Sequence, residues 1–129
     1  MHPPRIPRVV PKGRRTPNPR RRAQHLAFVR ELPCVACGWD GEGVQAAHVR
    51  AGTNGGMGMK PEDRYAVPLC AEHHAKQHRI GELSFWSALG IDPLNVALRL
   101  WTISGDILAG ERIVFRARQH INLMRSSHE

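Results

Sequence analysis

The stretch PLCAEHHAKQH, residues 68–78, decides the fold prediction because it places one cysteine and three histidines within nine positions. At about 100° per residue, a helix puts Cys70 and His73 on one face. The same helix puts His74 and His78 on a second face, roughly 90° away. One short helix can therefore contribute side chains to two separate sites.

The first of these sites is completed by a Cys-x-x-Cys pair upstream, Cys34 and Cys37. Zinc prefers four tetrahedral sulfur or nitrogen ligands, and two residues three apart can hold one ion. We therefore predict a structural zinc site made of Cys34, Cys37, Cys70 and His73, closed to further chemistry. Two alternatives are buried free cysteines and a thiol–disulfide exchange pair. Exchange is disfavoured because no βαβ pattern surrounds the Cys-x-x-Cys pair.

Composition places the chain among small proteins of a reducing compartment. The 129 residues predict one domain, residues 19–129, preceded by an arm, residues 1–18. The three cysteines cannot all pair, and neither a secretory signal nor a membrane-length apolar run is apparent. We expect an intracellular, cytoplasmic protein with no membrane partner.

The net charge of +8 is concentrated at the start of the chain. Residues 1–22 contain eight Lys or Arg and no acidic residue, whereas the remaining residues contain eleven of each kind. Residues 1–18 interleave this charge with five prolines, so we expect a disordered basic arm. Such an arm adds salt-dependent affinity for phosphates, and the alternative is a solvated tail.

The pattern of apolar residues and turn signals predicts an α+β fold. Asn18-Pro19 predicts a helix start, and Pro33 ends that helix at about residue 32. Short strands are expected at 44–49 and 65–69, separated by a Gly-rich loop at 50–61. Further helices are expected at 71–81, 83–89, 93–105 and 108–125. In the helix from residue 93, the predicted buried face carries Leu94, Ala97, Leu98 and Trp101.

Together, these motifs resemble the HNH endonucleases, also called ββα-metal or His-Me finger nucleases. They are most similar to the compact phage and prophage HNH proteins related to the RecA-dependent nuclease Ref. The resemblance rests on Cys-x-x-Cys, an isolated His ending a strand, a Gly-rich loop and Leu-Cys-x-x-His-His-x-x-x-His. It covers about residues 30–82 and implies a zinc-stapled ββα core, with the C-terminal helices at about 83–125 outside it.

The resemblance also implies residue roles. His48 matches the general base that activates water, and His74 and His78 match the histidines that hold a catalytic divalent ion. Histidine suits the base because its ordinary pKa is near neutral. The chain departs from the family at Ala47, where many members have a further metal ligand. It also departs at Tyr65, which aligns near the middle Asn of the HNH motif, the residue that orients the base in that family. Either water fills the coordination position that Ala47 leaves open, or His48 is itself a metal ligand and the general base lies elsewhere.

The expected activity is metal-dependent hydrolysis of DNA phosphodiester bonds. Besides the structural zinc, a second divalent ion is implied, whether magnesium, manganese, nickel, cobalt or zinc. The side chains expected to contact DNA are Arg20, Arg21, Arg22, Arg50, Asn54 and Lys60. The alternative is a catalytically inactive zinc module that binds DNA or a phage or recombination protein.

Overall fold

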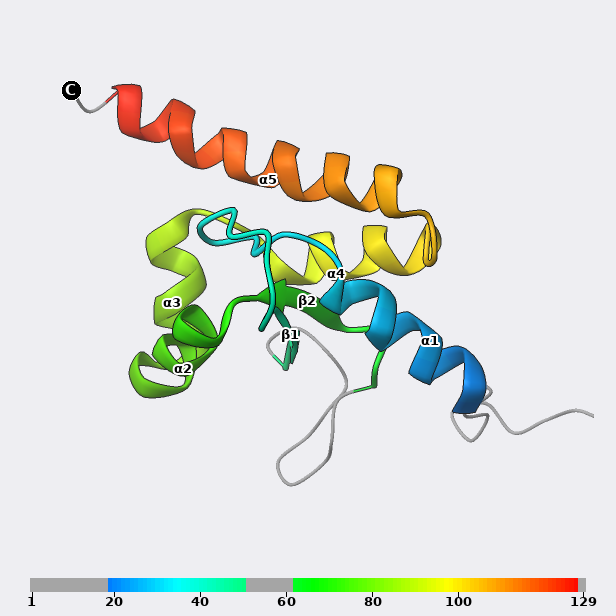
Figure 1. The fold of residues 1–129 in the computed structure, drawn as a ribbon. Helices are drawn as coiled ribbons and strands as arrows, with labels where there is room; N and C mark the ends of the chain where they lie inside the picture. Colours follow the sequence, from blue (N-terminus) through cyan, green and yellow to red (C-terminus); the bar gives the residue numbers. More distant parts are fainter. Residues whose placement is uncertain (1–18, 51–61, 128–129) are drawn as a thin grey trace, which may run out of the picture.

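The computed structural model describes residues 19–50 and 62–127, and side chains within 22–50 and 62–119. Over this part the chain has an α+β fold of five helices and one two-stranded sheet (Figure 1). The elements in chain order are α1 (Pro19–Arg30), β1 (Gln45–His48), β2 (Ala66–Leu69), α2 (Ala71–Ile80), α3 (Glu82–Leu89), α4 (Pro93–Thr102) and α5 (Ile107–Ser127). Each predicted helix and strand is present, with bounds within a few residues of those expected. The predicted basic arm and the Gly-rich loop after residue 50 lie outside the described residues.

The sheet lies at the centre of the fold and is contacted by α1, α2 and α4 (Figure 1). Its strands are antiparallel, and the register pairs Gln45 with Leu69 and His48 with Ala66. All four residues of β2 are buried, as expected for a strand covered on both sides. The register therefore brings the end of β1 beside the chain that enters β2.

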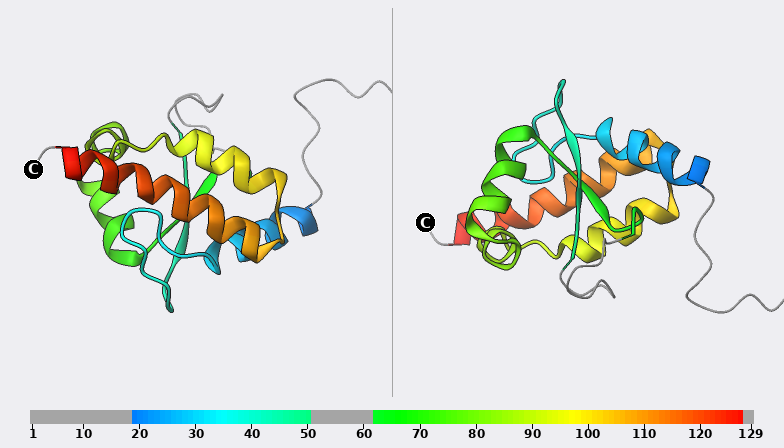
Figure 2. Two further views of the ribbon diagram at one scale, coloured as in Figure 1. Left: turned by 90° about the horizontal axis from the view of Figure 1, so that it is seen from above. Right: turned by 90° about the horizontal axis from the view of Figure 1, so that it is seen from below.

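Helices α4 and α5 are adjacent and run in opposite directions along one side of the molecule (Figure 2). In α4, the buried residues are Val96, Ala97 and Leu100, whereas Leu98 is exposed. The predicted buried face of this helix was therefore wrong for Leu98. Because α4 is apolar around most of its circumference, its neighbours β2 and α5 decide which side is buried.

A glycine allows α5 to approach α1 closely. A Cβ atom at Gly110 would lie 2.9 Å from a methyl carbon of Leu32 and 2.9 Å from the ring of Phe28. Real Cβ atoms do not approach other heavy atoms this closely. The absence of a side chain at Gly110 therefore allows the last helix to close over the apolar core.

Local signals position the helices at the other end of the sheet. Cys70 is the N-cap of α2, and its sulfur accepts a hydrogen bond from the backbone N–H of His73. Gly81 ends α2 with a positive φ of 96°, so α3 begins at once and folds back on α2. The buried Trp86 Nε1 donates to Gln77 Oε1 at 3.1 Å, which fixes α3 against α2.

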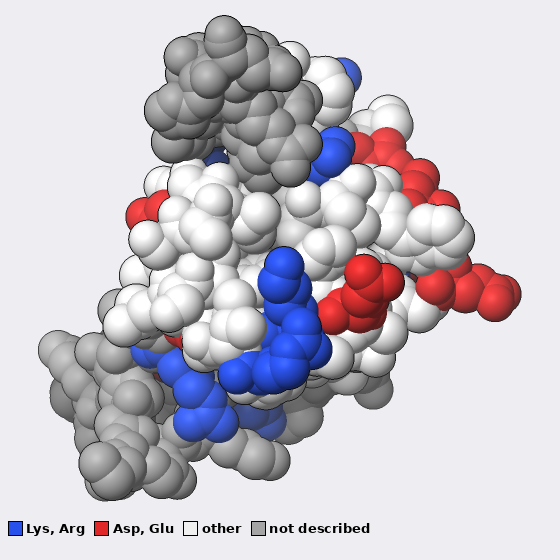
Figure 3. Space-filling model, turned by 90° about the vertical axis from the view of Figure 1, so that its left-hand side faces the viewer, with Lys and Arg blue, Asp and Glu red and all other residues white. Residues whose placement is uncertain are grey.

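The surface at the α2–α3 end carries both basic and acidic side chains, some of them side by side (Figure 3). Exposed basic residues of α2 are Lys76 and Arg79.

None of the helices in the described part of the chain is both long and apolar enough to cross a bilayer. The predicted cytoplasmic location stays a prediction.

Candidate metal centres

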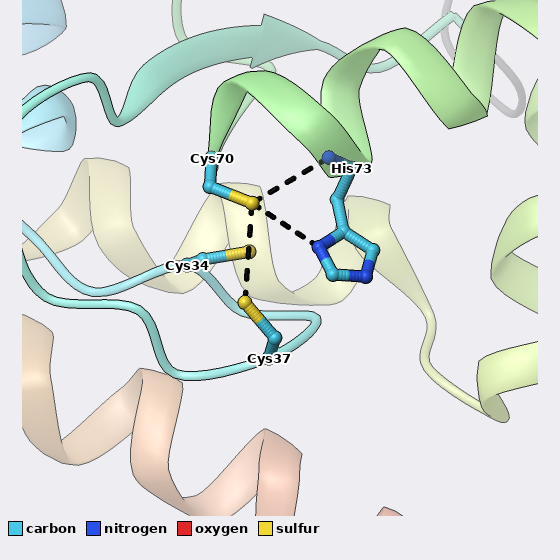
Figure 4. A group of neighbouring side chains, drawn as sticks. All are labelled: Cys34, Cys37, Cys70 and His73. Atoms are coloured by element: carbon cyan, nitrogen blue, oxygen red, sulfur yellow. Dashed lines mark hydrogen bonds between the residues drawn. The ribbon is translucent and has the colours of Figure 1, made fainter.

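The four residues predicted to bind zinc come together at one point, between the turn after α1 and the start of α2 (Figure 4). The ligand atoms of Cys34, Cys37, Cys70 and His73 all lie within 4.8 Å of one another. Among the described residues, these four form the one group of three or more His, Cys, Asp or Glu side chains close enough to hold a common ion. The cysteines are free thiols, so no disulfide competes for them.

Backbone hydrogen bonds form the knuckle that carries Cys34 and Cys37. Gly38 N–H donates to Cys34 O at 2.7 Å, and Gly38 has a φ of 82°, which favours glycine. Val35 N–H donates to Pro68 O at 3.0 Å, tying the knuckle to β2. Because β2 leads directly into Cys70, this bond fixes the first cysteine pair beside the second pair.

The spacing of the Cys37 and Cys70 sulfurs fits a tetrahedral zinc ion. Cys37 Sγ lies 3.9 Å from Cys70 Sγ, and Cys70 Sγ lies 3.1 Å from His73 Nδ1. Zinc–sulfur bonds of about 2.3 Å at tetrahedral angles place two sulfurs about 3.8 Å apart. Two backbone N–H groups, those of Ala36 and His73, point at the sulfurs of Cys34 and Cys70. Three thiols and one imidazole are a donor set that zinc prefers, so this Cys3His cluster can hold a metal such as zinc.

The electrostatics of the cluster hold the proton on the Cys37 thiol. Burial raises the pKa of the Cys37 thiol to about 11, and the neighbouring Cys34 and Cys70 add to the rise, against a hydrogen bond from the Trp39 backbone. A metal must therefore displace a tightly held proton, and zinc binding at this cluster is pH-dependent.

The second predicted site brings His74 and His78 together on the exposed side of α2. His74 Nε2 lies 3.2 Å from His78 Nε2. Gln45 Oε1 of β1 lies 2.6 Å from His74 Nδ1 and accepts its hydrogen, which leaves the Nε2 lone pair directed at His78. Burial, followed by the charges of His78 and His48, lowers the pKa of His74 from its ordinary 6.5. His74 is therefore neutral at neutral pH, as a metal ligand must be.

His48 lies at the end of β1, near enough to His74 for its charge to act there. Its Nε2 lies 2.8 Å from Asp63 Oδ1, and the two side chains are 35% and 24% exposed. The carboxylate accepts the Nε2 hydrogen, so the Nδ1 lone pair is left for another proton. Asp63 was not among the residues predicted for the site. No sequence signal marks it, because the contact depends on the antiparallel register that places the entry of β2 opposite His48.

The residues at which the chain departs from the HNH pattern have structural roles. Ala47 is completely buried in the core, so a ligand at this position would face apolar side chains. The Tyr65 carbonyl accepts a hydrogen bond from Val49 N–H at 2.7 Å, which continues the pairing beyond β1. Ala47 has no polar side chain to contribute, and Tyr65 packs against the apolar core.

The residues predicted to contact DNA are described only in part. Arg22 is half-buried and Arg50 is exposed, and the Arg50 backbone N–H donates to the carboxylate of Glu82 at 3.0 Å. The side chains of Arg20, Arg21, Asn54 and Lys60 lie outside the described residues. Their predicted contacts stay predictions.

Comparison with known proteins gives one relative and one family. Residues in this chain are 33% identical over 55 positions to "Uncharacterized protein YdfU" of Escherichia coli (strain K12). This alignment covers 43% of the chain and 15% of the relative, so the chain spans a small part of that protein's length. No solved structure matches the chain.

A family model matches residues 3–97, which include both candidate metal centres and the knuckle. The match covers well over half of the chain. The chain therefore belongs to the family described as "Protein of unknown function (DUF968)".

Proposed function

We propose that the protein is a metal-dependent endonuclease of the HNH kind, which hydrolyses phosphodiester bonds of DNA. The observation that carries the proposal is the placement of His74 against His78, with His48 close enough for its charge to act on His74. Each of these histidines is given an orientation by a second residue or by its neighbour. Gln45 orients His74, Asp63 orients His48, and His78 lies against His74. Exposed histidines without a shared role have no need of such fixed orientations.

In this proposal His48 is the general base. Its Nδ1 has no hydrogen-bond partner in the described part of the chain, and Asp63 holds the proton on Nε2. Nδ1 takes a proton from water, the water oxygen attacks phosphorus, and the bond from phosphorus to the 3′ oxygen breaks. Asp63 takes the role that the middle Asn has in HNH nucleases, which is to orient the base. Its hydrogen bond fixes both the tautomer and the plane of the His48 imidazole.

His74 and His78 are the proposed ligands of a catalytic divalent cation. With metal–nitrogen bonds of about 2.0–2.1 Å, two imidazole nitrogens on one ion lie about 3.0–3.4 Å apart. The distance of 3.2 Å between His74 Nε2 and His78 Nε2 fits this range. When bound there, a divalent cation offsets the negative charge that develops on the phosphate and on the departing 3′ oxygen. Since Ala47 faces the core, the described part of the chain offers two side-chain ligands, His74 and His78, and leaves the other positions to water and phosphate.

The Cys3His cluster has a structural role in this account. Its four ligands close a tetrahedral site, which leaves no position for a substrate. Cys70 and His73 lie immediately before His74 in the chain, so zinc at the cluster holds the start of α2 against the knuckle. The fixed helix then presents His74 to Gln45 and His48.

The test is cleavage of supercoiled plasmid by the zinc-loaded protein with manganese, compared with single variants His48→Ala, His74→Ala and His78→Ala. The matched control is Lys76→Ala, an exposed position on the same helix. The proposal predicts cleavage by the wild type and by Lys76→Ala, and loss of cleavage in each histidine variant. Equal cleavage by wild type and histidine variants, or none by the wild type with manganese, magnesium, nickel or cobalt, would contradict it. The second result would favour a catalytically inactive zinc module that binds DNA or a phage or recombination protein.

A further inference from the structure

A second basic surface lies between α4 and α5, formed by residues that have no part in the candidate metal centres. It is a groove of about 560 Å³, and its polar lining includes Arg99, Arg112 and Arg116. No acidic residue lines it. Between the arginines its floor consists of small and aliphatic side chains, among them Ala109 and Ala117. The groove thus combines three positive charges with a shallow apolar floor.

The three arginines are available to an external anion. None of them forms an ion pair with any residue in the described part of the chain. Arg99 Nε donates to Asn95 Oδ1 at 3.1 Å, one helical turn earlier. This bond restrains the guanidinium, and its two terminal nitrogens have no hydrogen-bond partner among the described residues. Arg99 therefore loses less side-chain conformational entropy when it binds an anion.

The spacing of the arginines fits the phosphates of a nucleic-acid strand. Arg112 and Arg116 are four residues apart on α5, which corresponds to a rise of about 6 Å. One strand of B-DNA carries a phosphate about every 3.4 Å along the axis, so the two guanidiniums can reach neighbouring phosphates. Arg99 supplies a third contact from the opposite wall of the groove. Guanidinium groups bind phosphate oxygens in a bidentate manner, which adds to the fit.

We infer that the α4–α5 groove, through Arg99, Arg112 and Arg116, binds the phosphate backbone of DNA. The inference rests on the proposed function for the identity of the polyanion. It adds a contact surface beyond the proposed catalytic histidines, which lie on β1 and α2 whereas the groove lies between α4 and α5 (Figures 1 and 2). The groove therefore holds a stretch of DNA other than the phosphate being cleaved.

The experiment measures binding of a labelled duplex oligonucleotide by fluorescence anisotropy between about 50 and 200 mM salt, without added divalent metal. The triple variant Arg99→Gln, Arg112→Gln, Arg116→Gln is compared with the corresponding triple Lys variant and with Arg30→Gln, an exposed arginine at the end of α1. Circular dichroism and zinc content establish that each variant is folded.

We expect the triple Gln variant to bind the duplex about tenfold or more weakly than the wild type does. The magnitude of its slope of log affinity against log salt should be smaller by about 2–3. The triple Lys variant retains the slope because it retains the charge. If the triple Gln variant loses no more than three times the effect of Arg30→Gln, the inference is overturned, and an acidic protein segment becomes the better occupant of the groove.

Failure of the proposed function is visible separately. The His48→Ala variant is expected to bind the duplex as the wild type does, since His48 acts on the reacting water. If His48→Ala also cleaved plasmid as the wild type does, the catalytic assignment would fail while the binding result for the groove would stand.

Discussion

Replacing Cys70 by serine separates two roles that the cysteine has in this fold. Its sulfur is a predicted zinc ligand, and it is also the N-cap that accepts the backbone N–H of His73. Serine is a favourable N-cap residue and a poor zinc ligand, whereas alanine can do neither. Comparison of Cys70→Ser with the wild type therefore measures ligation apart from capping, and comparison of Cys70→Ser with Cys70→Ala measures capping.

The two contributions differ greatly in size. Losing an N-cap costs about 1 kcal/mol. Structural zinc contributes apparent binding free energies of about 10–16 kcal/mol in zinc-finger peptides, and the net stability of a small domain is about 5–15 kcal/mol. Removing one of the four ligands therefore loses more zinc-binding free energy than the whole free energy of unfolding of the domain. We expect both Cys70→Ser and Cys70→Ala to lose the zinc and to unfold, in spite of the restored cap in the serine variant.

The assay is zinc content after dialysis, together with thermal unfolding followed by circular dichroism. The wild type should retain one zinc per chain, and a chelator should unfold it. A Cys70→Ser protein that keeps the wild-type Tm without zinc would refute the reasoning, because Cys70 would then act as a helix cap alone.

Four further predictions concern the second site and the core. Asp63→Ala should lower the cleavage rate about 10- to 100-fold, which is part of the 10²–10⁴-fold that a general base contributes, and the control Glu62→Ala should not lower it. Equal rates for Asp63→Ala and the wild type would show that the carboxylate at position 63 does not orient the base. Gln45→Ala should weaken manganese binding about 10- to 100-fold by isothermal titration calorimetry, and unchanged affinity would remove its orienting role. In an NMR titration without added manganese, His74 should protonate with a pKa below its ordinary 6.5. Because the unfolded chain takes up this proton at a higher pH than the folded state does, acidification below 6.5 should destabilise the folded state. A titration midpoint at or above 6.5 would contradict this prediction. Gly110→Ala should destabilise the protein by about 1–3 kcal/mol in urea unfolding, because a methyl group there meets two apolar side chains, and an unchanged midpoint would contradict the close packing of α5 on α1.

Much of the fold was predictable because its signals are local. Proline at the first helical position, the Asp92 cap of α4 and the glycines that end α2 and α3 each act within a few residues. The Cys3His cluster was equally predictable. Zinc requires a small set of ligand types in close pairs, and the two members of each pair lie three positions apart in the sequence.

The partners of the histidines could not be predicted in the same way. Asp63 is fifteen residues from His48, and the contact exists only because the two strands pair in one register. Gln45 reaches His74 across the gap from β1 to α2. Such contacts depend on how elements pack, and neither residue type nor local spacing distinguishes them from solvated polar side chains. The exposure of Leu98 has the same cause, since the buried side of α4 is set by its neighbours.

The central claim is that His48 acts as the base of a phosphodiester hydrolase. It is tested most directly by the initial rate of plasmid cleavage at saturating manganese for wild type and His48→Ala, with and without added imidazole. The account predicts that the variant is at least about a hundredfold slower and that imidazole restores part of the rate, since a free base can enter the place of the missing ring. Cleavage by His48→Ala at the wild-type rate would contradict it.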